Sequence, residues 1–150
     1  MKKIASLLAI ILVIALTLPG CTRVGSSMNG SGKIMDTILE LEDFSSLNIQ
    51  GPFVVEVIQA PAYKATLSVD DNLVNRVKVS LERQTLNLSI AGPATFFPTS
   101  LKLKVEMPEL VSLSLADAAS AVVNGFKNTE NLTVFLSGNS ILQCAAQMET

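Results

Sequence analysis

The sequence predicts an all-β domain, and three observations support this prediction. From Phe44 onward, apolar and polar residues alternate with a period of two, which is typical of strands that bury one face. Turn-forming pairs such as Gly51-Pro52 and Asn124-Gly125 separate the alternating runs. A segment near the C-terminus recurs a short distance further along the chain. The runs follow one another too closely for a parallel sheet with crossover helices.

The first residues of the chain have the organisation of a secretory signal. Lys2 and Lys3 precede an uncharged, largely apolar run over Ile4–Leu18. This run has about 15 residues, fewer than the roughly 20 that a helix needs to cross a hydrocarbon core of ~30 Å. We therefore expect residues 1–20 to be a cleaved signal peptide rather than a lasting transmembrane anchor.

The box Leu18-Pro19-Gly20-Cys21 resembles the lipobox of bacterial lipoproteins, in which the cysteine receives a diacylglyceryl group and becomes the first residue. Leu18, Gly20 and Cys21 match that pattern, whereas Pro19 is uncommon at its position. The resemblance implies lipid attachment at Cys21, with the membrane as a partner, because two or more acyl chains hold a protein firmly at a bilayer. An ordinary signal with an incidental Cys21 is the alternative.

The composition beyond the signal is that of one folded domain on a tether. Residues 21–32 comprise the lipidated cysteine and a tether rich in Ser, Gly and Asn, which reaches at most about 35 Å. Residues 33–150 are expected to form the domain. The chain carries 11 basic and 13 acidic residues, and without Lys2 and Lys3 its net charge is about −4. This balance does not favour a nucleic-acid partner.

The alternating runs predict which side chains face the core. In each run every second residue is apolar, while residues such as Glu56, Asn87 and Lys102 point to the other face. Pro108 ends the cleanest run, Leu101–Met107, because proline cannot donate to a strand ladder. The predicted inward sets are Phe53, Val55 and Val57; Ala65, Leu67 and Val69; Leu86, Leu88 and Ile90; and Leu101, Leu103, Val105 and Met107.

Asp70-Asp71-Asn72 is the densest group of side-chain oxygens. One hypothesis is a polar turn in which an aspartate caps a short helical segment over Asp71–Asn75 through the amides of Leu73 and Val74. The other is part of a calcium site, because Ca²⁺ takes six to eight oxygen ligands. These three side chains supply only some of those ligands, so the polar turn is the simpler interpretation.

The C-terminal repeat predicts stacked coils. Val111–Leu115 can be laid on Leu132–Leu136, and the same offset then places Asp117 on Gly138 and Val123 on Cys144. A period of this length in a strand-rich sequence is typical of solenoids, in which each coil buries its inward face on the next. With two copies visible, chance alternation is the alternative interpretation.

The order of these segments resembles a family, the bacterial envelope proteins described as putative autotransporter adhesins with a head GIN domain. The resemblance covers the chain from about Phe44 to the end and implies a right-handed parallel β-helix-like solenoid of short coils, without established catalytic activity. Family members continue through several more coils, so the sequence is either a short or a C-terminally truncated member. The segments that carry the resemblance are Phe44-Ser45-Ser46-Leu47, Val55-Glu56-Val57-Ile58-Gln59, Leu67-Ser68-Val69-Asp70-Asp71-Asn72-Leu73, Thr85-Leu86-Asn87-Leu88, Val105-Glu106-Met107-Pro108-Glu109-Leu110 and Leu136-Ser137-Gly138-Asn139-Ser140.

The residues for common catalytic chemistry are missing from the sequence. The chain has no histidine, which removes the usual general base and the histidine metal ligands. It also lacks C-x-x-C pairs and the glycine motifs that bind nucleotides. We therefore predict no catalytic residue, no metal site and no cofactor. Since a lipidated Cys21 has no thiol to share, Cys144 is expected to be an unpaired, small and buried side chain.

Three phenylalanines are candidate contact residues. Phe96 and Phe97 are adjacent in a loop, so both cannot follow one inward face, and one of them is expected to close an end of the core. Phe135 is out of phase with its apolar neighbours and is expected to face outward. Aromatic side chains are enriched at interfaces.

The sequence thus favours a non-enzymatic, exported protein that is lipid-anchored at the surface of a cell-envelope membrane. There it would act as an adhesin-like domain that binds a protein or glycan partner, or as a structural domain. A carbohydrate-active enzyme on a β-helix, with Asp117 near a coil corner, is one alternative. The other is an oligomeric envelope subunit that pairs the open solenoid edges of identical chains.

Overall fold

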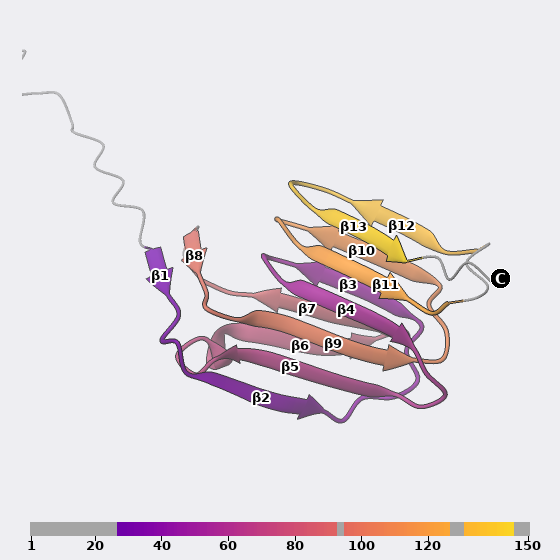
Figure 1. The fold of residues 1–150 in the computed structure, drawn as a ribbon, viewed down its shortest axis with the longest axis horizontal. Helices are drawn as coiled ribbons and strands as arrows, with labels where there is room; N and C mark the ends of the chain where they lie inside the picture. Colours follow the sequence, from indigo (N-terminus) through magenta and orange to yellow (C-terminus); the bar gives the residue numbers. More distant parts are fainter. Residues whose placement is uncertain (1–26, 93–94, 127–130, 146–150) are drawn as a thin grey trace, which may run out of the picture.

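The structure is a computed structural model that describes residues 27–92, 95–126 and 131–145. Within these ranges the chain forms strands, one short 3₁₀ helix and no α-helix, which confirms the all-β prediction (Figure 1). The elements are β1 (Ser27–Asn29), β2 (Ile34–Leu39), β3 (Ser46–Gln50), β4 (Val54–Gln59), β5 (Lys64–Asp70), η1 (Val74–Arg76), β6 (Val77–Glu82), β7 (Thr85–Ile90), β8 (Thr95–Phe97), β9 (Leu101–Met107), β10 (Ser112–Ala116), β11 (Ser120–Asn124), β12 (Thr133–Leu136) and β13 (Ile141–Ala145).

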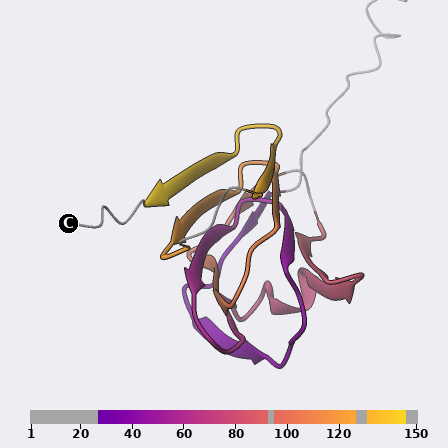
Figure 2. The same ribbon diagram turned by 90° about the vertical axis from the view of Figure 1, so that its right-hand side faces the viewer.

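Most strands lie in two sheets that face each other. One sheet has the strand order β12-β10-β3-β7-β6, and the other has the order β13-β11-β4-β9-β5-β2. β1 and β8 form a separate pair at one end of the strands (Figure 1). Figure 2, which looks along the strands, shows the two sheets on opposite sides of the domain. Buried apolar side chains from both sheets form one cluster between them.

Four pairs of strands, which we call layers, stack on one another through parallel strand pairing. Each layer contributes one strand to each sheet: β7 and β9, β3 and β4, β10 and β11, and β12 and β13. Neighbouring strands in these layers pair in parallel. Three further strands pair in antiparallel ladders: β6 pairs with β7, and β5 pairs with both β9 and β2. Arg83 and Gln84, both at positive φ, form the two-residue turn that reverses the chain between β6 and β7.

The antiparallel strands depart from the uniform parallel solenoid that the family resemblance implied. The predicted repeat is nevertheless present in the ladders. Leu115 lies beside Leu136, and Val123 lies beside Cys144, so the partners in both ladders have the predicted offset. Asp117 and Gly138 also share a left-handed backbone, with φ of 56° and 63°. The two C-terminal layers are therefore structural copies of each other.

The predicted inward sets are buried, apart from Ile90, which is half-buried. The outermost layer behaves differently, because β12 and β13 are the last described strands of their sheets. Leu136 is 50% exposed although its ladder partner Leu115 is fully buried. Cys144 is exposed, so its predicted burial is wrong: β13 has a neighbouring strand, β11, on one side only.

Two leucines at one register position test how the layers bury the core. We expect Leu115→Ala to lower the free energy of unfolding by about 3 kcal/mol, because it leaves a cavity in a closed core. Leu136→Ala is the matched control, and it should cost about 1 kcal/mol or less, because solvent already reaches that side chain. Urea unfolding curves measure both changes. Equal losses for the two variants would contradict the exposed position of β12.

Candidate functional site

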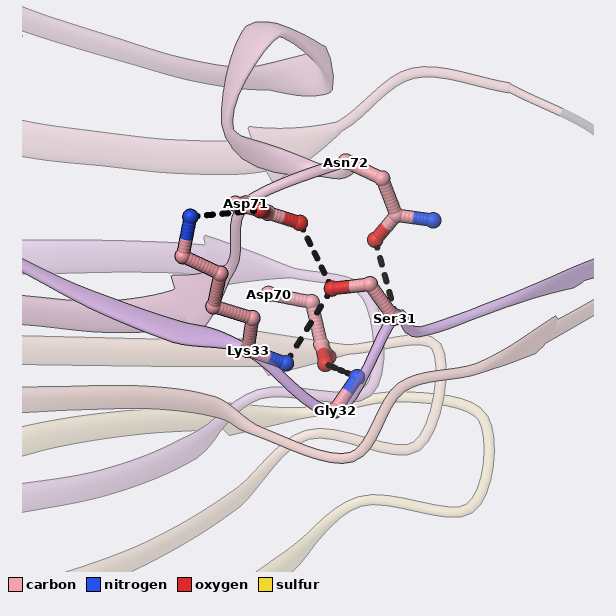
Figure 3. Close-up of polar contacts among 6 residues, drawn as sticks. All are labelled: Ser31, Gly32, Lys33, Asp70, Asp71 and Asn72. Atoms are coloured by element: carbon pink, nitrogen blue, oxygen red, sulfur yellow. Dashed lines mark hydrogen bonds and ion pairs between the residues drawn. The ribbon is translucent and has the colours of Figure 1, made fainter.

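The polar turn after β5 attaches the N-terminal segment to the domain (Figure 3). Asp70, the last residue of β5, has a buried side chain. Its Oδ1 accepts a hydrogen bond from the amide of Gly32 at 2.9 Å. Its Oδ2 accepts hydrogen bonds from the amides of Thr99 and Ser100 at 2.8 and 3.1 Å. One carboxylate thus joins the N-terminal segment to the segment that precedes β9.

Asp71 and Asn72 hold the same N-terminal segment. The hydroxyl of Ser31 donates to Asp71 Oδ1 at 2.6 Å, and the Ser31 amide donates to Asn72 Oδ1 at 3.1 Å. The Asn72 side chain donates in turn to the carbonyl of Asn29 at 2.9 Å. An ion pair of 3.6 Å between Lys33 and Asp71 adds little, because the lysine is largely exposed. We call the residues Ser31, Gly32, Asp70, Asp71 and Asn72 the N-terminal clamp.

The contacts of the clamp bear on the two hypotheses for Asp70-Asp71-Asn72, a helix-capping turn and a calcium site. Leu73, the N-cap of η1, receives no side-chain cap, so the predicted capping by an aspartate is wrong. The Leu73 amide donates instead to the backbone carbonyl of Asp70 at 2.9 Å. Because the oxygens of the clamp accept hydrogen bonds from amides and a hydroxyl, they fit the polar-turn hypothesis. In the described ranges, no group of three or more acidic or cysteine side chains is placed to hold a metal ion.

The clamp lowers the pKa values of both aspartates. Burial raises the pKa of the Asp70 carboxyl, but the amides of Ser100, Gly32 and Thr99 stabilise its charged form and together bring the pKa below its ordinary value. The hydrogen bond from Ser31 lowers the pKa of Asp71, against a smaller opposing effect of burial. Both groups are therefore held as carboxylates at neutral pH.

Backbone contacts extend this attachment. β1 pairs in parallel with β8, which places Met28 beside Phe96, and the Gly30 amide donates to the Phe97 carbonyl at 2.9 Å. A Cβ at Gly30 would lie 2.6 Å from the Thr99 nitrogen and still closer to Asp70 Oδ2, so only glycine fits there. The end of the expected tether, residues 27–32, therefore lies against the domain.

This attachment shortens the reach of the tether. Cys21 lies outside the described residues, and the described chain begins at Ser27. The segment that joins Cys21 to Ser27 can span at most about 20 Å, whatever its conformation. A lipid on Cys21 would therefore keep the β1 end of the domain within that distance of the bilayer surface, rather than the roughly 35 Å expected from the full tether.

A hollow of about 630 Å³ lies at the end of the first sheet, next to β8. Its volume is within the range of about 300–1,000 Å³ that is usual for ligand pockets. The side chains of Gln50, Lys78, Ser89, Phe96, Asp117 and Ala118 contribute to its lining. We call this feature the corner hollow.

The parallel ladders bring the lining of the corner hollow together. Lys78 pairs with Ser89, Ser89 pairs with Gln50, and Gln50 pairs with Ala116, the residue before Asp117. Asp117 was a candidate because it lies near a coil corner, and Phe96 because it is a loop aromatic. The structure places both residues in the lining of the same hollow. Gln50, Lys78 and Ser89 were not predicted, because no local pattern marks residues that meet only through strand pairing.

The polar groups of the corner hollow are available to a ligand. Within the described part of the chain, the side chains of Gln50, Lys78 and Asp117 form no hydrogen bond or ion pair with other residues. All three are exposed, and Phe96, which packs partly on the core, is half-buried. The hollow therefore combines free donors and acceptors with one aromatic surface.

The corner beside the hollow has an unfavourable backbone conformation. Asp117 and Ala118 have φ values of 56° and 70°, and Ala118 lacks a side chain that could stabilise this conformation. The equivalent position of the next layer is Gly138, which adopts positive φ without strain. Backbone strain is often retained where a side chain has a functional role.

The other candidate contact residues lie apart from the hollow. Phe97 and Phe135 are each 60% exposed, and Phe135 faces outward as predicted. Phe135 lies on β12 with exposed apolar neighbours. We call the residues Val134, Phe135, Leu136 and Ile141 the C-terminal apolar edge.

The comparison with protein families identifies the chain as a member of a known family. The chain belongs to the family described as putative auto-transporter adhesin, head GIN domain, which matches residues 43–150. No curated protein matches the chain.

Solved structures share the fold. A putative adhesin from Bacteroides fragilis gives a TM-score of 0.66 at 20% identity, over 77% of this chain and 57% of that chain. A putative lipid binding protein from Parabacteroides distasonis gives a TM-score of 0.60 at 19% identity, over 66% of this chain and 44% of that chain. A putative adhesin from Parabacteroides merdae gives a TM-score of 0.57 at 19% identity, over 65% of this chain and 41% of that chain. The chain thus spans about half the length of these proteins, and the likeness concerns the fold alone.

In the described residues, no helix has the length and apolar character needed to cross a membrane.

Asp70→Asn tests the clamp. An amide nitrogen in place of one carboxylate oxygen would face a backbone amide, so we expect a loss of about 2 kcal/mol in the free energy of unfolding at pH 7. The folded-state pKa of Asp70 lies below the unfolded-state value of about 3.9, so the stabilisation is complete above that pH. It is lost as the pH falls through the folded-state pKa. Urea unfolding at pH 7 and pH 3 measures both effects.

The variant should therefore lose less stability than the wild type on acidification. Asp43→Asn, which removes an exposed carboxylate, is the control and should behave like the wild type. An unchanged acid dependence in Asp70→Asn would contradict the role of this carboxylate.

Proposed function

We propose that the chain is a non-enzymatic, adhesin-like binding protein, exported and held at the surface of a cell-envelope membrane by a lipid on Cys21. The observation that carries this proposal is the match over residues 43–150 to a family described as putative auto-transporter adhesin, head GIN domain. Its partner is a protein or a glycan. Two solved proteins with the same fold also bear the name of putative adhesins.

The N-terminal segment supports the anchored arrangement. The sequence up to Cys21 has the organisation of a lipoprotein signal, and the N-terminal clamp fixes residues 27–32 on the domain. A short link of at most about 20 Å then connects lipid and domain. The domain would be held in a restricted orientation, because the clamp and the β1–β8 pairing attach the link at one end of the strands.

The parallel layers support a binding role for the fold. We regard them as part of a β-helix-like solenoid, whose stacked strands give broad, regular outer faces. Among the described residues that line the corner hollow, Asp117 is the single carboxylate. Hydrolysis of glycosides ordinarily uses two carboxylates, so this lining is better suited to binding than to the alternative of a carbohydrate-active enzyme.

Cys21→Ser tests anchoring and function together. Without the acceptor thiol, the protein should move from the membrane fraction to the soluble fraction, because burial of acyl chains supplies the attachment. In cells that lack the native gene, the wild-type gene should restore attachment to a mucin-coated or polysaccharide-coated surface, and Cys21→Ser should not. Cell fractionation and counts of attached cells measure the two effects.

Cys144→Ser is the matched control, because it changes the exposed second cysteine and should preserve both properties. The proposal is wrong about the anchor if Cys21→Ser stays with the membrane. It is wrong about adhesion if deletion of the gene leaves attachment unchanged.

The C-terminal apolar edge favours a second candidate role, the oligomeric envelope subunit. β12 and β13 are the outermost described strands of their sheets, and Phe135, Leu136 and Ile141 are each at least half exposed. Pairing with the same edge of a second copy would cover these side chains and extend both ladders.

Light scattering of the full chain in detergent tests this role. A dimer is expected, and Phe135→Glu should convert it to a monomer, because a carboxylate would be buried in the interface. Phe97→Glu, at an equally exposed phenylalanine away from β12, should leave the dimer intact. A monomeric wild-type protein would exclude the oligomer.

A further inference from the structure

We propose that the corner hollow binds a saccharide, with an uncharged sugar ring placed on Phe96 and its hydroxyl groups bound by Gln50, Lys78 and Asp117. This inference rests on the proposed function, whose partner class it narrows from protein or glycan to glycan. It draws on the shape of the hollow, the chemistry of its lining and its place in the fold.

The floor of the hollow is a row of side chains across neighbouring strands. Lys78, Ser89 and Gln50 occupy paired positions on β6, β7 and β3, and Asp117 follows β10. Neighbouring strands lie about 4.8 Å apart, so the row from β6 to β10 is about 14 Å long. The polar part of the lining thus runs across the sheet over that length, which suits a short stretch of a linear oligosaccharide.

The lining has the two kinds of groups that a sugar ring requires. Sugars present hydroxyl groups around a ring whose faces carry C–H bonds. The amide of Gln50, the hydroxyl of Ser89, the ammonium group of Lys78 and the carboxylate of Asp117 offer both donors and acceptors. The half-buried ring of Phe96 offers a flat apolar surface. The hollow therefore places polar groups and apolar surface side by side.

The charges of the lining favour an uncharged ligand. Lys78 and Asp117 are the charged residues among the described lining side chains, and their charges offset each other. An anionic ligand would gain from Lys78 but would be repelled by Asp117, and the reverse holds for a cation. A neutral sugar can hydrogen-bond to both groups, and such charge-assisted bonds are stronger than bonds between neutral groups.

The strained corner gives an independent reason to assign a role to Asp117. Gly138 shows that glycine fits the same corner in the next layer, yet this layer carries Asp117 and Ala118 at positive φ. Positive φ is unfavourable for Ala118, whereas aspartate tolerates it better than most residues other than glycine. A carboxylate directed at a ligand accounts for an aspartate at this position.

The position of the hollow indicates two sources of the saccharide. Phe96 pairs with Met28 on β1, the strand that continues toward Cys21. A lipid on Cys21 would therefore keep the hollow close to the bilayer. The sugar can belong to a free polysaccharide or to the headgroup of a glycolipid in the same membrane, and the chemistry of recognition is shared.

The experiment uses the full chain, purified in a zwitterionic detergent without a sugar headgroup. Titration calorimetry with cellohexaose, maltohexaose, laminarihexaose and mannohexaose tests free saccharides, and sedimentation with vesicles that contain galactosyl or glucosyl diacylglycerol tests headgroups. We expect at least one probe to bind with a Kd of about 1 mM or tighter. Asp117→Asn should weaken that binding about tenfold, since it removes a charge-assisted hydrogen bond while keeping size and tolerance of positive φ.

Matched variants separate the site from general effects. Phe96→Ala should also weaken binding, whereas Phe97→Ala, at the neighbouring exposed ring, should not. Asp43→Asn removes another aspartate at positive φ and should leave binding unchanged. Thermal unfolding of each variant identifies any loss of fold, and Asp117→Asn supplies the decisive comparison if Phe96→Ala is unstable.

The inference fails if no neutral probe binds, if only the charged trigalacturonic acid or chitosan hexamer binds, or if Asp117→Asn binds as tightly as the wild type. Its failure is distinguishable from failure of the proposed function. Cells that carry Asp117→Asn would then still attach like the wild type, whereas a wrong function predicts no attachment defect even when the whole gene is deleted.

Discussion

The two sheets bury their apolar faces against each other, and this burial fixes the register of the parallel ladders within them. Side chains alternate along a strand, so a slip of one residue would turn Leu113 and Leu115 out of the core. The constant length of the C-terminal repeat brings each inward residue back over its equivalent in the neighbouring layer. The corners of neighbouring layers must then lie at equivalent positions along the chain. Asp117 therefore adopts the left-handed conformation that Gly138 adopts more easily in the next layer.

The clamp and the corner hollow are both consequences of this register. The ladders set the positions of β5, β7 and β8, so the buried carboxylate of Asp70 meets the amides before β9 and those of the N-terminal segment. β1 then reaches β8 and lies beside Phe96, which lines the hollow. The N-terminal segment and the proposed sugar site therefore share one end of the domain, while the C-terminal apolar edge lies in the outermost described layer. With the lipid proposed on Cys21, the clamp would determine which end of the domain faces the membrane.

Local patterns predicted the features that depend on local chemistry. The inward set Phe53, Val55 and Val57 is buried as expected, because alternation along one strand is enough to define its apolar face. The repeat gave the correct pairing of Leu115 with Leu136. Burial of Cys144 could not be predicted in the same way, because it depends on whether another strand covers the layer. The partners of Asp70 were missed for a similar reason: Gly32, Thr99 and Ser100 are all distant from it in the chain.

The order and spacing of residue types were enough to predict the all-β class, the faces of the strands, the length of a layer and the family. Three features could be learned only from the folded chain: β5 and β6 run opposite to the parallel strands, residues 27–32 lie on the domain, and Gln50, Lys78 and Asp117 meet in one hollow. These features arise from pairing between strands that are distant in the chain. Hydrophobic periodicity indicates which face of a strand is buried, but it does not indicate which other strand pairs with that strand.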